Sequence, residues 1–439
     1  PARRARQCGN PGGRGLTGDA ARRAGRGAAM TAVMDRSAVS AATWTIGAPR
    51  LLAGLDRHAV LDHRTHVGVH GELPGTDLPR LLTLLDASGL AGRGGAGFPL
   101  AAKLRALRGR RPSVVVNGSE SEPASRKDRT LLRRSPHLVV DGALAVAAAV
   151  NAWRVTIAVH DALAAQAVHA ALGQRPDASQ VRVEQVGGGF VASEARALVR
   201  ALADVPALPP GRREHATDKG ILVANPETFA QLAVLVRLGR RRFADTGTGS
   251  EPGTTLLTIG GAVGRPGVIE IPLGTPLGIV LTAAQAHDTA AVVIGGYHGG
   301  WHVPLPNIEL SRAGLAAAGG MLGAGVVLAV DGATCALGEL ARVTAWLAGE
   351  SAGQCGPCLF GLPALAQDVL ALHQGHPSAV DTALRHARAV DGRGACSHPD
   401  GTARFVTSGL HLLRDETERH LRGGCGRPVL GRLPIGVQT

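Results

Sequence analysis

Three cysteines in the C-terminal part of the chain have the spacing of metal ligands. Cys355 and Cys358 form a Cys-x-x-Cys pair, and Cys396 follows nearer the C-terminus. Thiolates are the ligands that iron–sulfur clusters require. His398 lies two residues beyond Cys396, and these four side chains together would also suit a tetrahedral zinc ion. The sequence therefore indicates a cluster, a zinc ion, or a degenerate site without metal.

A glycine-rich loop at residues 92–99, with the sequence GRGGAGFP, could bind phosphate. Glycine reaches positive φ at little steric cost and lets the backbone approach a ligand closely. Residues 101–107 are expected to form a helix, so the loop would present N–H groups at a helix N-terminus, where the dipole favours anions. Lys103 adds a positive charge in the first turn. The loop is neither a GxGxxG fingerprint nor a P-loop, and an ordinary turn is the alternative.

Polar residues follow directly after a predicted buried strand at residues 113–116 (SVVV). The next segment, 117–123, reads NGSESEP and includes one amide and two carboxylates, from Asn117, Glu120 and Glu122. Open α/β sheets bind their ligands at the carboxyl ends of the strands. The segment is therefore a candidate ligand site, and a solvated loop is the alternative.

The elements that would position these groups alternate between residues 48 and 250. Short β-rich runs are followed by Ala/Leu-rich helical runs, which is typical of an α/β layered domain with parallel strands. Besides 113–116, the expected strands are 154–159 and 181–186, and the expected helices are 136–150, 161–172 and 194–203.

The remainder of the folded chain changes character twice. Residues 251–330 contain short strands separated by Gly/Pro turns, which indicates a small β-rich module. Residues 331–439 are mostly helical, and Asp331 or Thr334 is the expected N-cap of the first helix. The stretch 414–420 (RDETERH) is expected to be the exposed, charged face of a helix with i,i+4 ion pairs.

Composition narrows the class of protein. The chain has 439 residues, 45% hydrophobic and 18% charged, as in globular proteins. The net charge is +13, but residues 1–45 hold eight Arg against two Asp, and residues 1–47 are expected to be a disordered tail. Because no Lys/Arg cluster is interleaved with aromatic residues, no nucleic-acid partner is expected. No apolar run reaches the ~18–20 residues of a membrane span. The cysteine usage suits a reducing cytoplasm.

The stretch 90–99 (LAGRGGAGFP), followed by Lys103, closely resembles the signature loop of the flavin-binding, NADH-oxidising subunit of respiratory complex I. The same family includes flavin subunits of NAD-dependent formate dehydrogenases and NAD-reducing hydrogenases. In that family the loop holds flavin mononucleotide (FMN) and contacts NADH. The resemblance implies that Gly94, Gly95, Ala96 and Gly97 line the nucleotides, that Phe98 stacks near the nicotinamide, and that Lys103 meets phosphate.

The segment after the predicted strand 113–116 also resembles the family. Asn117, Glu120 and Glu122 match positions near the flavin ring, the ribityl chain and the nicotinamide. Ser119 stands where the family has a carboxylate, so it can accept a hydrogen bond there but carries no charge.

Two further segments match the family in the same order. In 187–198 (GGGFVASEARAL), Phe190 replaces a family Tyr, Glu194 matches the first of two glutamates, and Ala195 replaces the second. Asn225 and Thr228, in the sequence NPET, match a stretch that helps to hold the flavin phosphate. The lost carboxylate at Ala195 makes nicotinamide binding a less secure expectation than flavin binding.

The cysteine set resembles the family's [4Fe–4S] ligands with one member missing. The family has Cys-x-x-Cys-x-x-Cys and one distant Cys, but Ala352 occupies the first position here. Neither Cys335 nor Cys425 stands at that position. A 4Fe–4S cluster with three thiolates and another ligand, or a 3Fe–4S cluster, would preserve electron transfer.

The resemblance implies a Rossmann-like FMN/NADH-binding α/β domain at 48–250, a β-grasp module of the soluble-ligand-binding (SLBB) type at 251–330, and a helical iron–sulfur-binding domain at 331–439. NADH would pass hydride to FMN, and single electrons would leave through the cluster to a thioredoxin-like 2Fe–2S subunit or a ferredoxin. No side chain is expected to act as nucleophile or general base. The alternatives are a non-catalytic scaffold or sensing subunit, and a flavoenzyme that uses a ferredoxin-type donor.

Overall fold

The computed structural model describes residues 42–436. The disordered tail expected at residues 1–47 therefore lies, for residues 1–41, outside the described part of the chain. The remaining residues of that stretch contain β1 (Thr43–Thr45), which pairs with β7 (Gly267–Pro272). A tail that extends to residue 47 is therefore wrong, because β1 is already part of a sheet. The sequence near residue 43 does not reveal this strand, because its partner lies more than two hundred residues away.

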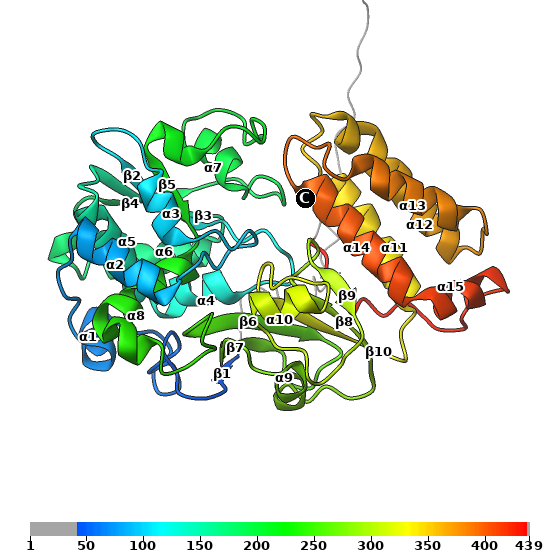
Figure 1. The fold of residues 1–439 in the computed structure, drawn as a ribbon, viewed down its shortest axis with the longest axis horizontal. Helices are drawn as coiled ribbons and strands as arrows, with labels where there is room; N and C mark the ends of the chain where they lie inside the picture. The colour runs from blue at the N-terminus through cyan, green and yellow to red at the C-terminus, as the bar shows by residue number, and fades with distance from the viewer. Residues whose placement is uncertain (1–41, 437–439) are drawn as a thin grey trace, which may run out of the picture. The chain divides into compact units, whose positions relative to one another are not determined.

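A four-stranded parallel sheet forms the first layer of the α/β part, as the alternating pattern predicted (Figure 1). All three strand pairs run parallel. The strand order is β4 (Val181–Gln185), β3 (Arg154–Val159), β2 (Ser113–Gly118) and β5 (Ile221–Ala224).

Both faces of this sheet are covered by helices. Successive strand residues point to opposite faces, so Val114 and Val116 join the large core beneath the sheet while Val115 packs with Leu198 on the other side. The strands β2, β3 and β5 are largely buried and mostly apolar, whereas the edge strand β4 is more polar and more exposed. The helices of this part are α1 (His63–His70), α2 (Leu78–Ser88), α3 (Leu100–Arg105), α4 (Lys127–Arg134), α5 (Pro136–Ala149), α6 (Ala162–Leu172), α7 (Ala195–Ala201) and α8 (Pro226–Phe243).

Helices α5 and α8 approach each other closely beneath the sheet. A Cβ atom added at Gly142 of α5 would lie 1.9 Å from the carbonyl oxygen of Phe229 of α8. Only glycine therefore permits this contact. Among residues 42–436, no helix has both the length and the apolar character that crossing a membrane requires.

A second, mixed sheet follows. Its strand order is β1, β7, β6 (Thr254–Gly261), β10 (Val326–Asp331), β8 (Thr289–Ile294) and β9 (Gly300–His302). One face packs on α9 (Leu277–Ala283) and the other on α11 (Ala336–Gly349) and α14 (His398–Leu412), on opposite sides of the sheet in Figure 1. The short helix α10 (Arg312–Ala317) lies between β9 and β10 in the sequence.

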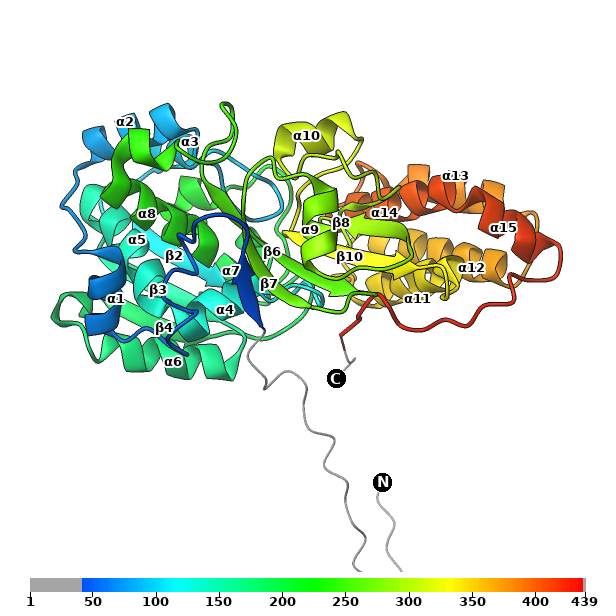
Figure 2. The same cartoon turned by 90° about the horizontal axis from the view of Figure 1, so that it is seen from below.

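The C-terminal part is helical, and Figure 2 shows its helices grouped together. The first helix, α11, begins at neither expected cap. Its N-cap is Cys335, whose sulfur accepts a hydrogen bond from the N–H of Gly338. The other helices are α12 (Leu362–His373), α13 (Ala379–Val390) and α15 (Arg414–Leu421).

The expectation of an exposed charged face at 414–420 is wrong for one side of α15. Glu416 and His420 are buried, at 5% and 7% exposure. They lie four residues apart, on one side of the helix. Arg422 and Glu418 do form an exposed i,i+4 ion pair on the other side. A charged sequence therefore conceals an inward-facing polar pair.

Candidate functional site

A cavity of about 730 Å³ lies at the carboxyl end of β2. Its walls come from residues 119–123, from the glycine turn 187–190, and from Trp346 and Glu350 at the end of α11. Its volume is within the ~300–1,000 Å³ typical of ligand pockets. Two of the predicted segments, after β2 and after β4, therefore meet around one cavity.

Glu122 lines this cavity and has one buried oxygen without a hydrogen-bond partner in the described part of the chain. Its side chain is buried, and Oε2 accepts a hydrogen bond of 2.9 Å from the N–H of Tyr297. Oε1 has no protein partner among the described residues. Burial raises the pKa of Glu122 to about 7. A group that can exchange a proton near neutral pH thus faces the pocket.

We expect the free energy of unfolding of Glu122→Gln to rise, relative to that of the wild type, as pH rises. The folded-state pKa lies above the ordinary value of 4.5, so the folded chain holds this proton longer than the unfolded chain does. The wild type loses stability as pH rises from about 4.5 through about 7. Between pH 5 and pH 8 the difference in free energy of unfolding should shift by about 2 kcal/mol towards the variant.

Urea unfolding at the two pH values measures this shift. Glu214→Gln is the matched control, because Glu214 forms an exposed ion pair with Lys219. Its difference from the wild type should be the same at pH 5 and pH 8. A pH-independent difference for Glu122→Gln as well would contradict the raised pKa.

Glu120 and Asn117 are held mainly by the chain itself. Glu120 accepts hydrogen bonds from Ser125 Oγ and from the Arg129 guanidinium, at 2.5 and 3.1 Å. Burial alone would raise the pKa of Glu120, but Arg129 and Ser125 have the larger combined effect, so its pKa lies below the ordinary value. Asn117 donates to the carbonyl of Ser193 at 2.8 Å, which joins the second and third predicted segments.

The glycine-rich loop lines a second cavity, of about 260 Å³. Cβ atoms built at Gly94 and Gly95 would meet nothing within 4 Å, so the backbone there faces open space. Gly97 has φ +57°, and a Cβ on it would lie 2.4 Å from Nε of Arg312. Other lining residues include Arg93, Ala96, Glu227 and Gly325.

Arg93 gives this second cavity a buried positive charge. Its side chain is 2% exposed, and its Nε lies 4.0 Å from Oε1 of Glu227 without a hydrogen-bond partner among the described residues. Burial lowers the pKa of Arg93 to about 10, which still leaves it charged at neutral pH. A buried guanidinium with one unbonded N–H, beside the open backbone of the loop, suits an anion such as phosphate.

The loop is tied to the fourth predicted segment. The N–H of Arg93 donates to Thr228 Oγ1 at 2.9 Å. Asn225 caps α8 and accepts from the N–H of Thr228 at 3.2 Å. Lys103 Nζ donates to the carbonyl of Val223 at the end of β5, at 2.9 Å.

A buried ion pair fixes this junction. Lys127 Nζ lies 2.8 Å from Glu227 Oε2 and 3.2 Å from the carbonyl of Arg93. The other oxygen of Glu227 accepts from the N–H of Leu256 in β6, at 2.9 Å. Lys127 and Glu227 therefore connect α4, α8, the glycine-rich loop and the mixed sheet.

The three predicted cluster cysteines lie near one another in the helical part. Cys358 is in a π-helical turn just before α12, and its sulfur lies 3.7 Å from that of Cys355. Cys358 and Cys396 are each 3% exposed. Arg212 donates to the carbonyl of Cys396 at 3.0 Å and so holds the third ligand loop. Two buried thiols and the partly exposed thiol of Cys355 suit a cluster held by three thiolates, and the methyl group of Ala352 offers no fourth ligand.

His398 does not point towards these sulfurs as a free ligand. Its Nε2 lies 2.9 Å from the carbonyl of Leu347, and its Nδ1 lies 3.0 Å from Nε2 of His298. Because both ring nitrogens have partners, the zinc alternative that used His398 is not favoured.

Comparison with known proteins identifies the family. Residues 85–234 match the model of the Nuo51 FMN-binding domain, and residues 338–420 match the NADH-ubiquinone oxidoreductase-F iron-sulfur binding region. The F subunit of the NADH-quinone oxidoreductase of Streptomyces coelicolor is 30% identical over 383 residues, covering 79% of this chain and 84% of the relative. The chain belongs to this family of NADH-quinone oxidoreductase F subunits. The Mycobacterium tuberculosis member is 29% identical over 384 residues, covering 78% and 85%.

A solved member of the wider fold group agrees with this assignment. NAD+-reducing [NiFe]-hydrogenase in the air-oxidized state has a chain that superimposes with a TM-score of 0.77 and 26% identity. The match covers 88% of this chain and 68% of that chain.

The predicted nucleotide contacts of this NADH-quinone oxidoreductase family member fall into three groups. Gly94 to Gly97 line the smaller cavity, and Glu120, Glu122 and Phe190 line the larger one. Lys103, Asn117, Asn225 and Thr228 stabilise the segments between them. Phe98 is half exposed and lines neither cavity, and Glu194 caps α7 and pairs with Arg196.

Several residues at these cavities have no role that the sequence alone predicts. Arg93 is recognisable only as part of the loop, and Arg312, Trp346 and Glu350 lie far from the nucleotide-binding motifs in the sequence. The only local indication that Arg93 lines the cavity is its position between glycines, because a long charged side chain there must point either into solvent or into the site.

Proposed function

We propose that this chain is an NADH dehydrogenase subunit that takes hydride from NADH onto FMN and releases the electrons singly through an iron–sulfur cluster. The observation that carries this proposal is the presence, in one chain of this family, of an FMN-binding region and an iron–sulfur-binding region. NADH loses two electrons and one proton as hydride and becomes NAD+. Bound FMN supplies the conversion between two-electron and one-electron transfer.

The chain's own residues would bind and orient the nucleotides. The open backbone of Gly94 and Gly95, with Arg93 and Arg312 beside it, supports placing phosphate at the glycine-rich loop. The larger cavity, lined by Glu120, Glu122 and Glu350, suits hydroxyl or ring N–H groups, from which carboxylates can accept hydrogen bonds. Phe190 lies on its apolar wall and would exclude water.

Cys355, Cys358 and Cys396 would hold the cluster, as either a 4Fe–4S or a 3Fe–4S species. The support is their burial, their proximity and the match of residues 338–420 to the iron–sulfur-binding region. Leu359 and Phe360, directly after Cys358, are 53% and 74% exposed. We propose that an electron-accepting partner, a thioredoxin-like 2Fe–2S subunit or a ferredoxin, docks here, where the path to the cluster is short.

The domain limits belong to the same proposal. We propose an FMN/NADH-binding domain at 48–250, a β-grasp module of the SLBB type at 251–330, and a helical iron–sulfur-binding domain at 331–439. The mixed sheet with α9 packed across one face supports the β-grasp assignment. A cytoplasmic location stays a prediction.

Purified protein tests the function. We expect a yellow protein whose flavin absorbance is bleached by NADH, together with bound iron and an electron paramagnetic resonance signal after reduction. Cys396→Ser should lose most of the iron and that signal, while NADH still bleaches the flavin. Cys425→Ser is the matched control and should keep both.

Three outcomes would separate the alternatives. Colourless protein without flavin would indicate a non-catalytic scaffold. Flavin that is reduced by ferredoxin but not by NADH would indicate a different donor. Equal iron in wild type and Cys396→Ser would refute the assigned cluster ligands.

A further inference from the structure

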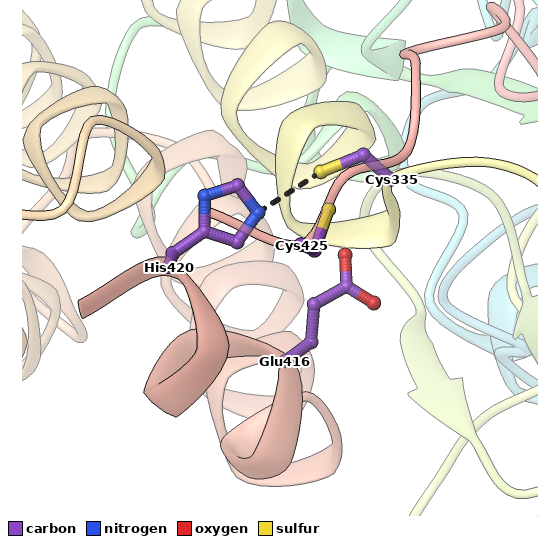
Figure 3. A group of neighbouring side chains, drawn as sticks. All are labelled: Cys335, Glu416, His420 and Cys425. Atoms are coloured by element: carbon purple, nitrogen blue, oxygen red, sulfur yellow. Dashed lines mark hydrogen bonds between the residues drawn. The ribbon is translucent and has the colours of Figure 1, made fainter. Parts of the chain in front are cut away.

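A second group of metal-binding side chains lies away from the proposed cluster. Cys335, Glu416, His420 and Cys425 place one ligand atom each within 4.8 Å of all the others. Figure 3 shows the four side chains converging from α11, α15 and the segment after α15. We propose that these residues form a structural zinc site.

The distances suit a tetrahedral ion after a small contraction. Ligand atoms bound to zinc at ~2.0–2.3 Å stand about 3.3–3.8 Å apart in a tetrahedron. His420 Nε2 and Cys335 Sγ are already 3.3 Å apart. Two thiolates, an imidazole and a carboxylate are all zinc ligands, and four protein ligands leave no open position, as in structural sites.

The histidine is oriented as a ligand. Its Nδ1 lies 2.7 Å from the carbonyl oxygen of His373, which can only accept a hydrogen bond. Nδ1 therefore carries the proton, and the lone pair of Nε2 points into the group. A backbone carbonyl that fixes the tautomer in this way is the usual outer partner of a metal-bound histidine.

The other ligands have outer partners as well. Cys335 caps α11, and its sulfur accepts from the N–H of Gly338 at 3.3 Å. Glu416 accepts from the N–H of Leu337 at 3.0 Å and from Arg427 at 3.3 Å. Two thiolates, one carboxylate and Zn²⁺ leave one negative charge, which the guanidinium of Arg427 offsets.

The zinc site would hold the segment after α15 in place. Cys425 is the ligand that belongs to the C-terminal segment, and Gly423, Gly424 and Gly426 around it have positive φ. Further along, Arg432 pairs with Asp331 at 2.6 Å. A metal bond at Cys425 would therefore hold this segment against α11, independently of flavin or cluster.

Metal analysis of the full chain, expressed with added zinc and purified under reducing conditions, tests the proposal. We expect about one zinc per chain in addition to iron. Cys335→Ser with Cys425→Ser should lose that zinc and keep the iron. Cys355→Ser, the matched control, should lose iron and keep zinc.

Cobalt substitution of the wild type gives a readout that does not depend on the variants' folding. Co²⁺ at this site should show tetrahedral d–d bands and sulfur-to-metal charge transfer, and removal of the metal should lower Tm by ~3 °C or more. Wild type without zinc, iron at these ligands, or a Cys335–Cys425 disulfide under non-reducing mass spectrometry would each overturn the proposal.

Discussion

Lys127→Met should lower the free energy of unfolding by about 3–5 kcal/mol, because it removes the close partner of the buried Glu227 and Asp128 and leaves Glu227, among the described residues, only the 4.0 Å ion-pair contact to Arg93. The Lys127 side chain is 3% exposed and that of Glu227 is fully buried. Methionine keeps the length of the side chain, so the loss reports the charge rather than a cavity. Urea unfolding followed by circular dichroism measures it.

Lys219→Met is the control for this prediction. Lys219 pairs with Glu214 at 3.0 Å, but the two side chains are 52% and 48% exposed. An exposed pair of this kind contributes ~0–1 kcal/mol. Equal changes for the two variants would show that the Lys127–Glu227 pair does not hold the junction between the two sheets.

Gly142→Ala should lower the free energy of unfolding by at least ~3 kcal/mol, the largest loss expected from adding one methyl group in the α/β part. The added Cβ would lie 1.9 Å from the Phe229 carbonyl, a backbone atom within α8 that no rotamer change can move. Helices α5 and α8 would have to separate, and the apolar residues between them would lose contacts. Chemical denaturation measures the loss.

Gly68→Ala separates this clash from the ordinary effect of alanine in a helix. Gly68 is in α1, and a Cβ there would meet nothing within 4 Å. Alanine should stabilise that helix by roughly 0.5–1 kcal/mol. A similar gain from Gly142→Ala would mean that α5 and α8 are not in close contact.

The α/β alternation was predictable because its signals are local. The predicted strands in 48–250 are short β-rich runs and the predicted helices are longer Ala/Leu-rich runs, so residue type and length sufficed. The expected strands 113–116, 154–159 and 181–186 correspond to β2, β3 and β4.

The errors involve partners that are distant in the sequence. β1 has three residues and is a strand because β7 pairs with it. One side of α15 is buried because Cys335 and the C-terminal segment contact it. Charge content predicts exposure on average, but a helix with charge on every side cannot reveal which side faces inward.

The site was predictable where a motif was contiguous. The glycine-rich loop, the segment after β2 and the cysteine pair are each short enough to be recognised alone. Arg312 and Trp346 reach the two cavities only through the folding of other domains. The group at Cys335 and Cys425 was missed because these cysteines lie ninety residues apart and join only when α15 turns back on α11.

The pairing of β1 with β7 has a consequence for biosynthesis. Thr43–Thr45 pair with residues 268–270, so the edge of the mixed sheet is formed by two segments that precede and follow the α/β part in the sequence. At ~5–20 residues per second of translation, β1 leaves the ribosome roughly 10–45 s before its partner strand exists. The α/β domain can fold in that interval, and the nascent chain must keep β1 available until β7 emerges.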